Sequence, residues 1–147
     1  MRSFRIFALW TVVFLCLLLA AGPLLWAEGN DNPSESAAAV KKISAKDAAS
    51  LIEKNKDNPD FVILDVRTPA EYSDGHIENA LNVDVKSESF TENAQKLDTE
   101  RTYLIHCRSG ARSAIAGAQM KELGFVDIYD IEGGFIAWEK QGYPVAK

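Results

Sequence analysis

The sequence predicts an α/β fold with a mainly parallel central sheet of about five strands flanked by helices. The first observation is that short apolar runs alternate with segments of helical spacing from Val40 onward. The second is that residues 61–64 are apolar without interruption, as expected for a strand buried on both faces. Strands that alternate with helices favour parallel pairing, with helices covering both faces of the sheet. Ligands bind such sheets at the carboxyl ends of the strands.

The elements of the first half follow in order from a clear helix start. Ser44 and Asp47 form a capping box, and Ala48, Leu51 and Ile52 continue from it at helical spacing. These residues predict a helix at the beginning of the domain. The other elements expected in this half are a strand at 61–64, a short helix at 70–73 and a short strand at 80–83.

The second half continues the alternation. Ser89 and Glu92 form a second capping box ahead of a short helix that carries Phe90 on its apolar face. Gly124 followed by Phe125 is typical of a helix end with its hydrophobic contact. The other elements expected here are a strand at 102–106, a helix at 113–123, a strand at 128–131 and a helix from about 135 to 140.

The N-terminal part has the pattern of an export leader. Arg2 and Arg5 precede residues 6–27, which contain no charge. A basic start before an apolar run is typical of a signal peptide, and this run is also long enough to span a bilayer. We therefore expect either a signal peptide cleaved near Ala27 or a retained membrane anchor. The expected organisation is a leader at 1–27, a flexible linker at 28–39 and a domain at 40–147, exported to the bacterial periplasm.

Charge and cysteine content restrict the class of function. The chain carries 21 acidic and 16 basic residues, with a net charge of −5, which argues against binding to nucleic acid. Cys16 lies in the leader, so Cys107 is the single thiol of the domain. An unpaired thiol in an exported protein is a reactive thiol, one half of an intermolecular pair, or a buried and inert side chain. A monomer is the default expectation.

Cys107 directly follows a predicted strand and opens the loop CRSGAR at 107–112, which leads into a helix. Gly110 supplies the conformational freedom that this turn needs. Such a loop directs backbone N–H groups inward and forms an anion-binding nest at the positive end of the helix. That setting, together with Arg108 and Arg112, lowers the pKa of a thiol and favours the nucleophilic thiolate. Arg112 is also expected to bind an oxyanion through two parallel hydrogen bonds.

Four short motifs follow one another along the domain. In order they are DVR at 65–67 with EY at 71–72, GHI at 75–77 with Ala80 and Asn82, CRSGAR at 107–112, and GG at 133–134 with Trp138, Gly142, Pro144 and Val145. Together they resemble the rhodanese family over nearly all of residues 40–145. One departure is Glu78-Asn79, where the family has a Pro-Gly-like pair, and Asn79 tolerates the left-handed conformation that Gly would adopt. The chain is expected to be the single-domain form, because no inactive companion domain is visible.

The resemblance implies a three-layer rhodanese-like fold and a thiosulfate sulfurtransferase in which Cys107 carries sulfur as a persulfide. Sulfur then passes to cyanide or another thiophilic acceptor, with no cofactor and no metal. Asp65, Arg67 and Glu71 are expected to form a structural ion-pair and cap network, with Arg67 near the rim of the pocket. The donor-binding residues are expected to be the rest of the loop and the residue after it: Arg108, Ser109, Gly110, Ala111, Arg112 and Ser113.

Loop length separates the chain from phosphatases that share this fold. Four residues lie between Cys107 and Arg112, one fewer than in those phosphatases, and the tighter loop fits a single sulfur atom. Two arginines favour a dianionic donor such as thiosulfate over mercaptopyruvate. Two alternatives stay open. One is a persulfide or polysulfide carrier that delivers sulfur to a partner protein with little turnover of small molecules. The other is a thiol redox protein, which would here lack a resolving cysteine.

Overall fold

The computed structural model describes residues 39–147, so the leader expected at 1–27 and the linker up to residue 38 lie outside the described residues. The strands are β1 (Val40–Ile43), β2 (Phe61–Asp65), β3 (Leu81–Asn82), β4 (Thr102–His106) and β5 (Asp127–Ile131). The helices are α2 (Ala45–Lys54), α3 (Pro69–Asp74), α4 (Phe90–Ala94), α5 (Ala111–Glu122) and α6 (Gly134–Lys140). Within residues 39–147, no helix has the length and apolar composition needed to cross a membrane.

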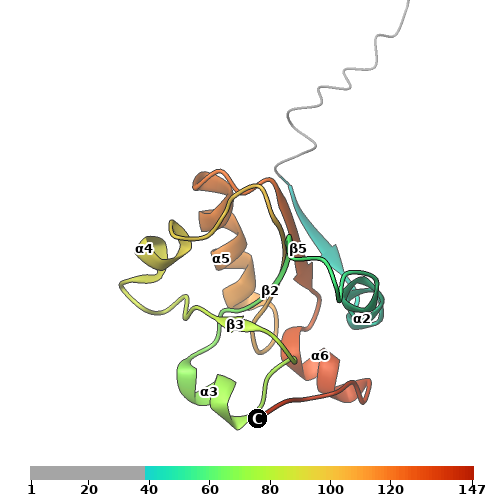
Figure 1. Cartoon of the computed structure of the whole chain (residues 1–147). Helices are drawn as coiled ribbons and strands as arrows, with labels where there is room; N and C mark the ends of the chain where they lie inside the picture. The colour runs from blue at the N-terminus through green and yellow to red at the C-terminus, as the bar shows by residue number, and fades with distance from the viewer. Residues whose placement is uncertain (1–38) are drawn as a thin grey trace, which may run out of the picture. The chain divides into compact units, whose positions relative to one another are not determined.

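All five strands run parallel in one sheet of order β1-β5-β4-β2-β3. Figure 1 shows α4 and α5 on one side of this sheet and α2 and α6 on the other. The predicted three-layer α/β architecture is therefore confirmed. The central strand β4 contributes to both cores, since Tyr103 and Ile105 pack under α5 and Leu104 packs under α2 and α6. Cys107 directly follows the carboxyl end of this strand.

Local signals at the ends of elements behave as the sequence predicts. The side chain of Ser44 accepts a 3.1 Å hydrogen bond from the backbone N–H of Asp47 and starts α2. Asn79 adopts a φ of 62°, the left-handed conformation that glycine would otherwise supply. Gly124 has a φ of 92° after α5, and the N–H of Phe125 returns to the carbonyl of Met120 at 3.1 Å. The turn at Asn79 and the helix end at Gly124 are confirmed, whereas the capping box at Ser44 forms only in part, because the Asp47 carboxylate accepts a 2.6 Å hydrogen bond from the Ser44 hydroxyl and none from the Ser44 N–H.

Two expectations for the short elements need correction. The second capping box is wrong, because Ser89 makes no side-chain cap to α4, and its hydroxyl lies 2.8 Å from that of Ser87 instead. β1 was not anticipated as a separate strand. It lies at the edge of the sheet, where Lys41 and Lys42 are exposed and only the outer two residues are partly buried. An edge strand of this kind lacks the continuous apolar run of a central strand.

The helix that follows the loop at 107–112 begins earlier than predicted. α5 starts at Ala111 rather than at residue 113, because Gly110 occupies the N-cap position with a φ of 102°. The left-handed glycine completes the turn within the loop, and the helix follows at once. Arg112 consequently belongs to the first helical turn, where its position is fixed by the helix backbone.

Candidate active site

Residues 107–112 wrap around the sulfur of Cys107 at the carboxyl end of β4. The Cys107 residue is only 1% exposed, and the N–H of Gly110 donates a 3.1 Å hydrogen bond to Sγ. The left-handed conformation of Gly110 turns this N–H back toward the sulfur. The sulfur also lies beside the first turn of α5, where the partial positive charge of the helix end favours an anion.

The pKa of the thiol reflects burial opposed by several hydrogen bonds. Burial of Cys107 raises the pKa, but donors from Ser113 (its N–H and hydroxyl) and the N–H groups of Ser109 and Gly110 together lower it below the ordinary value. The Ser113 hydroxyl also lies 3.1 Å from the carbonyl oxygen of Gly110. It has one proton, so it bonds either that carbonyl or the sulfur, and ionisation of the thiol favours the sulfur. The loop thus stabilises a thiolate.

The first turn of α6 is hydrogen-bonded to the backbone of the loop. The N–H of Phe135 donates to the carbonyl of Cys107 at 2.8 Å, and the N–H of Ile136 donates to that of Arg108 at 3.0 Å. This contact needs close approach, because a Cβ built on Gly134 would lie 2.4 Å from the carbonyl oxygen of Cys107. Gly134 also has a φ of 57°. The two hydrogen bonds fix the loop carbonyls outward and leave the amides on the sulfur side.

Arg112 forms a two-pronged ion pair with Glu71 of α3. Nη1 lies 2.6 Å from Oε2 and Nη2 lies 2.7 Å from Oε1, with the side chains 18% and 25% exposed. Oε2 also accepts hydrogen bonds from the N–H and hydroxyl of Thr68, which completes a capping box at α3. Hydrogen bonds from Arg112, opposed by burial and helped by Thr68, lower the pKa of Glu71 to about 2. The carboxylate therefore stays ionised at every physiological pH.

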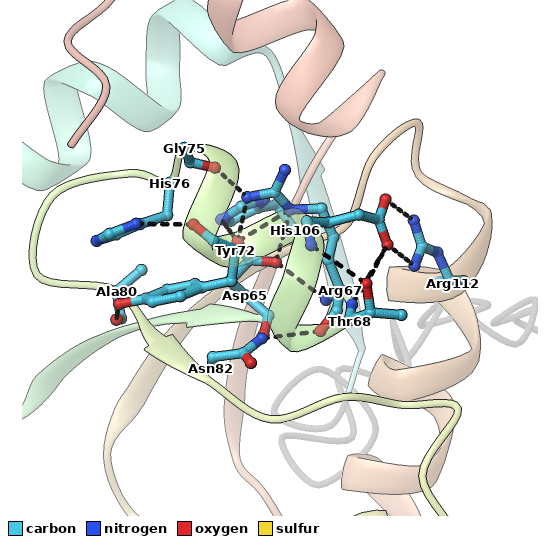
Figure 2. A network of polar contacts seen from close by, with 11 residues as sticks. Asp65, Arg67, Thr68, Tyr72, Gly75, His76, Ala80, Asn82, His106 and Arg112 are labelled. Carbon is cyan, nitrogen blue, oxygen red and sulfur yellow. Dashed lines mark hydrogen bonds and ion pairs between the residues drawn. The ribbon is translucent and has the colours of Figure 1, made fainter. Parts of the chain in front are cut away.

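Arg67 is held in a second ion pair, buried beside the loop (Figure 2). Its Nε and Nη2 bond the carboxylate of Asp65 at 2.6–3.0 Å, and Nη2 also donates to the carbonyl of Gly75 at 2.7 Å. The guanidinium lies over the ring of Phe135, 4.0 Å from the ring centroid. Asn82 bridges the same turn by donating to the carbonyls of Asp65 and Arg67. These contacts hold the Asp65–Arg67 turn in place, and Arg67 lines the pocket beside the loop.

His106, the residue before the cysteine, is fully buried, and burial lowers its pKa to about 4. Its Nε2 lies 3.7 Å from the carboxylate of Asp65, too far for a hydrogen bond. Neither ring nitrogen has a hydrogen-bond partner among the described residues. A neutral imidazole in this position does not add a positive charge beside the thiolate. Within residues 39–147, no group of three or more His, Cys, Asp and Glu side chains could hold a metal ion.

A pocket of about 400 Å³ opens beside the loop. The cavity is much larger than a thiosulfate or cyanide ion and falls in the size range of sites for larger organic ligands. Cys107 is covered by its own loop and does not line the pocket. The residues that line the cavity include Arg67, Glu71, Arg108, Phe135, Ile136 and Val145.

The residues singled out at 107–113 form the loop and the first turn of α5 beside Sγ, with different degrees of exposure. Arg108, Ser109 and Ala111 are exposed, Gly110 and Arg112 are half-buried, and Ser113 is buried. Sequence reasoning did not assign Gly134 to the site, although a pair of adjacent glycines is a signal for close backbone approach. It also gave no partner for Arg112, which lies 41 positions from Glu71 in the chain.

Residues 44–141 match the family model described as the rhodanese-like domain. The chain is 34% identical over 99 residues to a sulfurtransferase from Allochromatium vinosum, and the match covers 67% of this chain and 91% of that relative. It is also 34% identical over 130 residues to a tRNA uridine(34) hydroxylase from Salmonella paratyphi B. That match covers only 35% of the hydroxylase, so the activity of that larger protein does not pass to this chain.

Solved structures show the same fold. A rhodanese-related protein from Thermoplasma volcanium has a TM-score of 0.60 and 33% sequence identity to this chain. The superposition covers 72% of this chain and 97% of the other. The shared part thus spans nearly the whole of that protein and most of the described domain.

The close contact between α6 and the loop predicts that alanine at Gly134 destabilises the protein more than alanine at Gly142. Gly134→Ala should lower the free energy of unfolding by about 2–4 kcal/mol, because the new Cβ adds a collision to a left-handed backbone. Gly142→Ala is the matched control, since Gly142 has a φ of 74° with nothing within 4 Å of its Cβ position. It should cost about 1–2 kcal/mol. Urea denaturation of both variants measures the difference, and equal losses would contradict the collision.

The hydrogen bonds to Sγ predict a pH effect at Ser113. Ser113→Ala removes a donor to the thiolate and should raise the pKa of Cys107. Alkylation of Cys107 by iodoacetamide requires the thiolate, so its rate profile should move to higher pH. Ser109→Ala is the control, because Ser109 acts through its backbone N–H. The rate profile of Ser109→Ala should coincide with that of the wild type. If the profile of Ser113→Ala also coincides with it, the Ser113 hydroxyl does not lower the pKa of Cys107.

Proposed function

The chain belongs to the rhodanese-like domain family, and on that premise we propose that it is a thiosulfate sulfurtransferase acting through a persulfide on Cys107. The observation that carries the proposal is the setting of Sγ, which accepts hydrogen bonds from loop amides and lies at the start of α5. These donors stabilise a thiolate before the reaction and a terminal persulfide sulfur after it. Preorganised donors of this kind need no reorganisation when charge moves along the reaction path.

The proposed reaction is a double displacement. The Cys107 thiolate attacks the outer sulfur of thiosulfate, an S–S bond forms, the S–S bond of thiosulfate breaks and sulfite leaves with the electron pair. Cyanide or another thiophile then attacks the terminal sulfur of the persulfide, thiocyanate is released and the thiolate returns. Charge and atoms balance in both steps, so no cofactor or oxidant is needed. Such covalent catalysis predicts ping-pong kinetics.

The side of the loop that carries Arg108 is suited to the entry of an anion. Arg108 is exposed and lines the pocket, whereas Arg67 and Arg112 are each paired with a carboxylate. Arg108 therefore provides the guanidinium that is most accessible to an arriving donor. The tight loop, with four residues between Cys107 and Arg112, fits a single sulfur atom at its centre.

A second candidate is a sulfur carrier that loads the same persulfide and passes it to a partner protein. The pocket of about 400 Å³ beside the loop favours this candidate, because it is much larger than a cyanide ion and leaves room for a side chain of a partner protein. The two functions share the loading step and differ in the rate of unloading. A thiol redox function has less support, since Cys107 is the single cysteine in residues 39–147.

Intact mass of the purified protein tests the proposal. Incubation with thiosulfate should add one sulfur, about 32 Da, to the wild type, and cyanide should remove it as thiocyanate. Cys107→Ser should show neither change. A rapid cyanide chase supports the enzyme, and stoichiometric loading with a slow chase supports the carrier. If neither thiosulfate nor polysulfide loads Cys107, the sulfurtransferase proposal is wrong.

We also propose that residues 1–27 direct export and that the domain acts as a periplasmic monomer. The basic start and the uncharged stretch at 6–27 support export. Cell fractionation followed by N-terminal sequencing tests this. A periplasmic protein that begins just after Ala27 indicates a cleaved signal peptide, and a membrane-bound protein with residues 1–27 intact indicates an anchor. Full-length protein in the cytosol would contradict export.

A further inference from the structure

The guanidinium of Arg112, from the first turn of α5 after Cys107, faces the carboxylate of Glu71. Both of its terminal amino groups bond the two oxygens of Glu71, at 2.6 and 2.7 Å. This is the parallel geometry with which arginine binds carboxylates and other oxyanions. A donor that used the same face of Arg112 would have to displace Glu71. The ion pair is therefore a competitor of the donor within the protein itself.

Glu71 is held in place from its other side as well. Thr68 donates to the same carboxylate from its N–H at 3.3 Å and its hydroxyl at 3.1 Å, as part of the cap of α3. Moving Glu71 away from Arg112 would also disturb that cap. The pKa of Glu71, about 2, keeps the competitor charged throughout the physiological range. Glu71 also lines the pocket beside the loop, so its negative charge faces incoming anions.

We propose that Glu71 is a specificity-determining residue that withholds Arg112 from the donor, so that it lowers the preference of the site for dianionic sulfur donors such as thiosulfate relative to singly charged ones. The inference rests on the sulfurtransferase function proposed for Cys107. A dianion loses more than a monoanion, because it meets the carboxylate charge with twice the repulsion and gains more from a free guanidinium. Glu71 acts through Arg112 and is a positioning residue, since nothing in the reaction requires it to touch the reacting sulfur.

Two donors of nearly the same shape separate this charge effect from the chemistry. Thiosulfate is a dianion, and methanethiosulfonate replaces one of its oxygens by a methyl group and is a monoanion. In both, the Cys107 thiolate attacks the outer sulfur, an S–S bond forms and the donor's S–S bond breaks. The leaving groups are sulfite and methanesulfinate. That difference in leaving group is the same in every variant, so a change between variants in the ratio of kcat/KM for thiosulfate to that for methanethiosulfonate reports on donor charge.

Glu71→Gln is the test variant, because glutamine also completes a capping box and so preserves α3. It cannot offer Arg112 two charged oxygens. The thiosulfate to methanethiosulfonate ratio should rise about tenfold, the size expected for one recovered charge-assisted interaction. The change should appear mainly as a lower KM for thiosulfate. An unchanged ratio would overturn the proposal.

Two control variants isolate the ion pair. Thr68→Ala removes a hydroxyl that holds Glu71 but leaves both bonds to Arg112, so the ratio should rise much less than it does in Glu71→Gln. Asp84→Asn removes the other carboxylate that helps to raise the pKa of Arg112, after the larger effect of Glu71. Asp84 makes no hydrogen bond to that guanidinium among the described residues, so its loss should change the ratio much less than Glu71→Gln. If Asp84→Asn and Glu71→Gln changed the ratio equally, the cause would be the net charge of the site and the proposal would be wrong.

The route through Arg112 has its own readout. In an Arg112→Gln background, Glu71→Gln should raise the ratio only by the smaller amount that comes from removing the repulsion of the carboxylate, and a full tenfold gain there would overturn the proposed route. Loading of Cys107 measured by intact mass keeps the two hypotheses apart. If neither donor loads the wild type, the sulfurtransferase function fails. If both donors load it and Glu71→Gln leaves the ratio unchanged, only the role of Glu71 fails.

Discussion

The backbone of Cys107 and Arg108 is held by the first turn of α6, and the reactive loop depends on this contact. Phe135 and Ile136 donate hydrogen bonds to the two loop carbonyls. Because a peptide unit directs its carbonyl and its N–H to opposite sides, fixing the carbonyls outward helps to direct the following amides inward. The closeness of α6 in turn requires a residue without a Cβ at Gly134. The anion nest is thus a product of tertiary packing as well as of its own six residues.

Positive charge in the site is largely neutralised, which leaves oriented dipoles as the main stabilisers of the thiolate. Arg67 is paired with Asp65 in a buried contact, and Arg112 is paired with Glu71. Burial alone would raise the pKa of Cys107, yet hydrogen bonds from the loop and from Ser113 lower it. Amide dipoles fixed by the fold would keep their orientation as charge moves from the thiolate to the persulfide in the proposed reaction. Flexible charged side chains would have to rearrange.

The sequence predicts features that a few neighbouring residues determine. The cap at Ser44 and the turn at Asn79 follow from short-range geometry, and the central strands follow from their apolar runs. The edge strand β1 was missed because its interior residues are exposed lysines. The partner of Arg112 was missed because Glu71 lies on α3, and only the folded chain brings the two elements together. Pairings between distant elements are not encoded in any local pattern.

The Glu71–Arg112 ion pair has a consequence for interpreting loop sequences. Arg112 belongs to the loop, and the loop sequence alone predicts a free guanidinium for an anionic donor. Glu71 reaches it from 41 positions away and occupies both of its terminal amino groups. Two proteins with the same six-residue loop can therefore differ by one effective charge at the reacting sulfur, according to the residue that α3 presents. Donor preference in such a site is a property of the loop together with α3, because the charge that a donor meets is their sum.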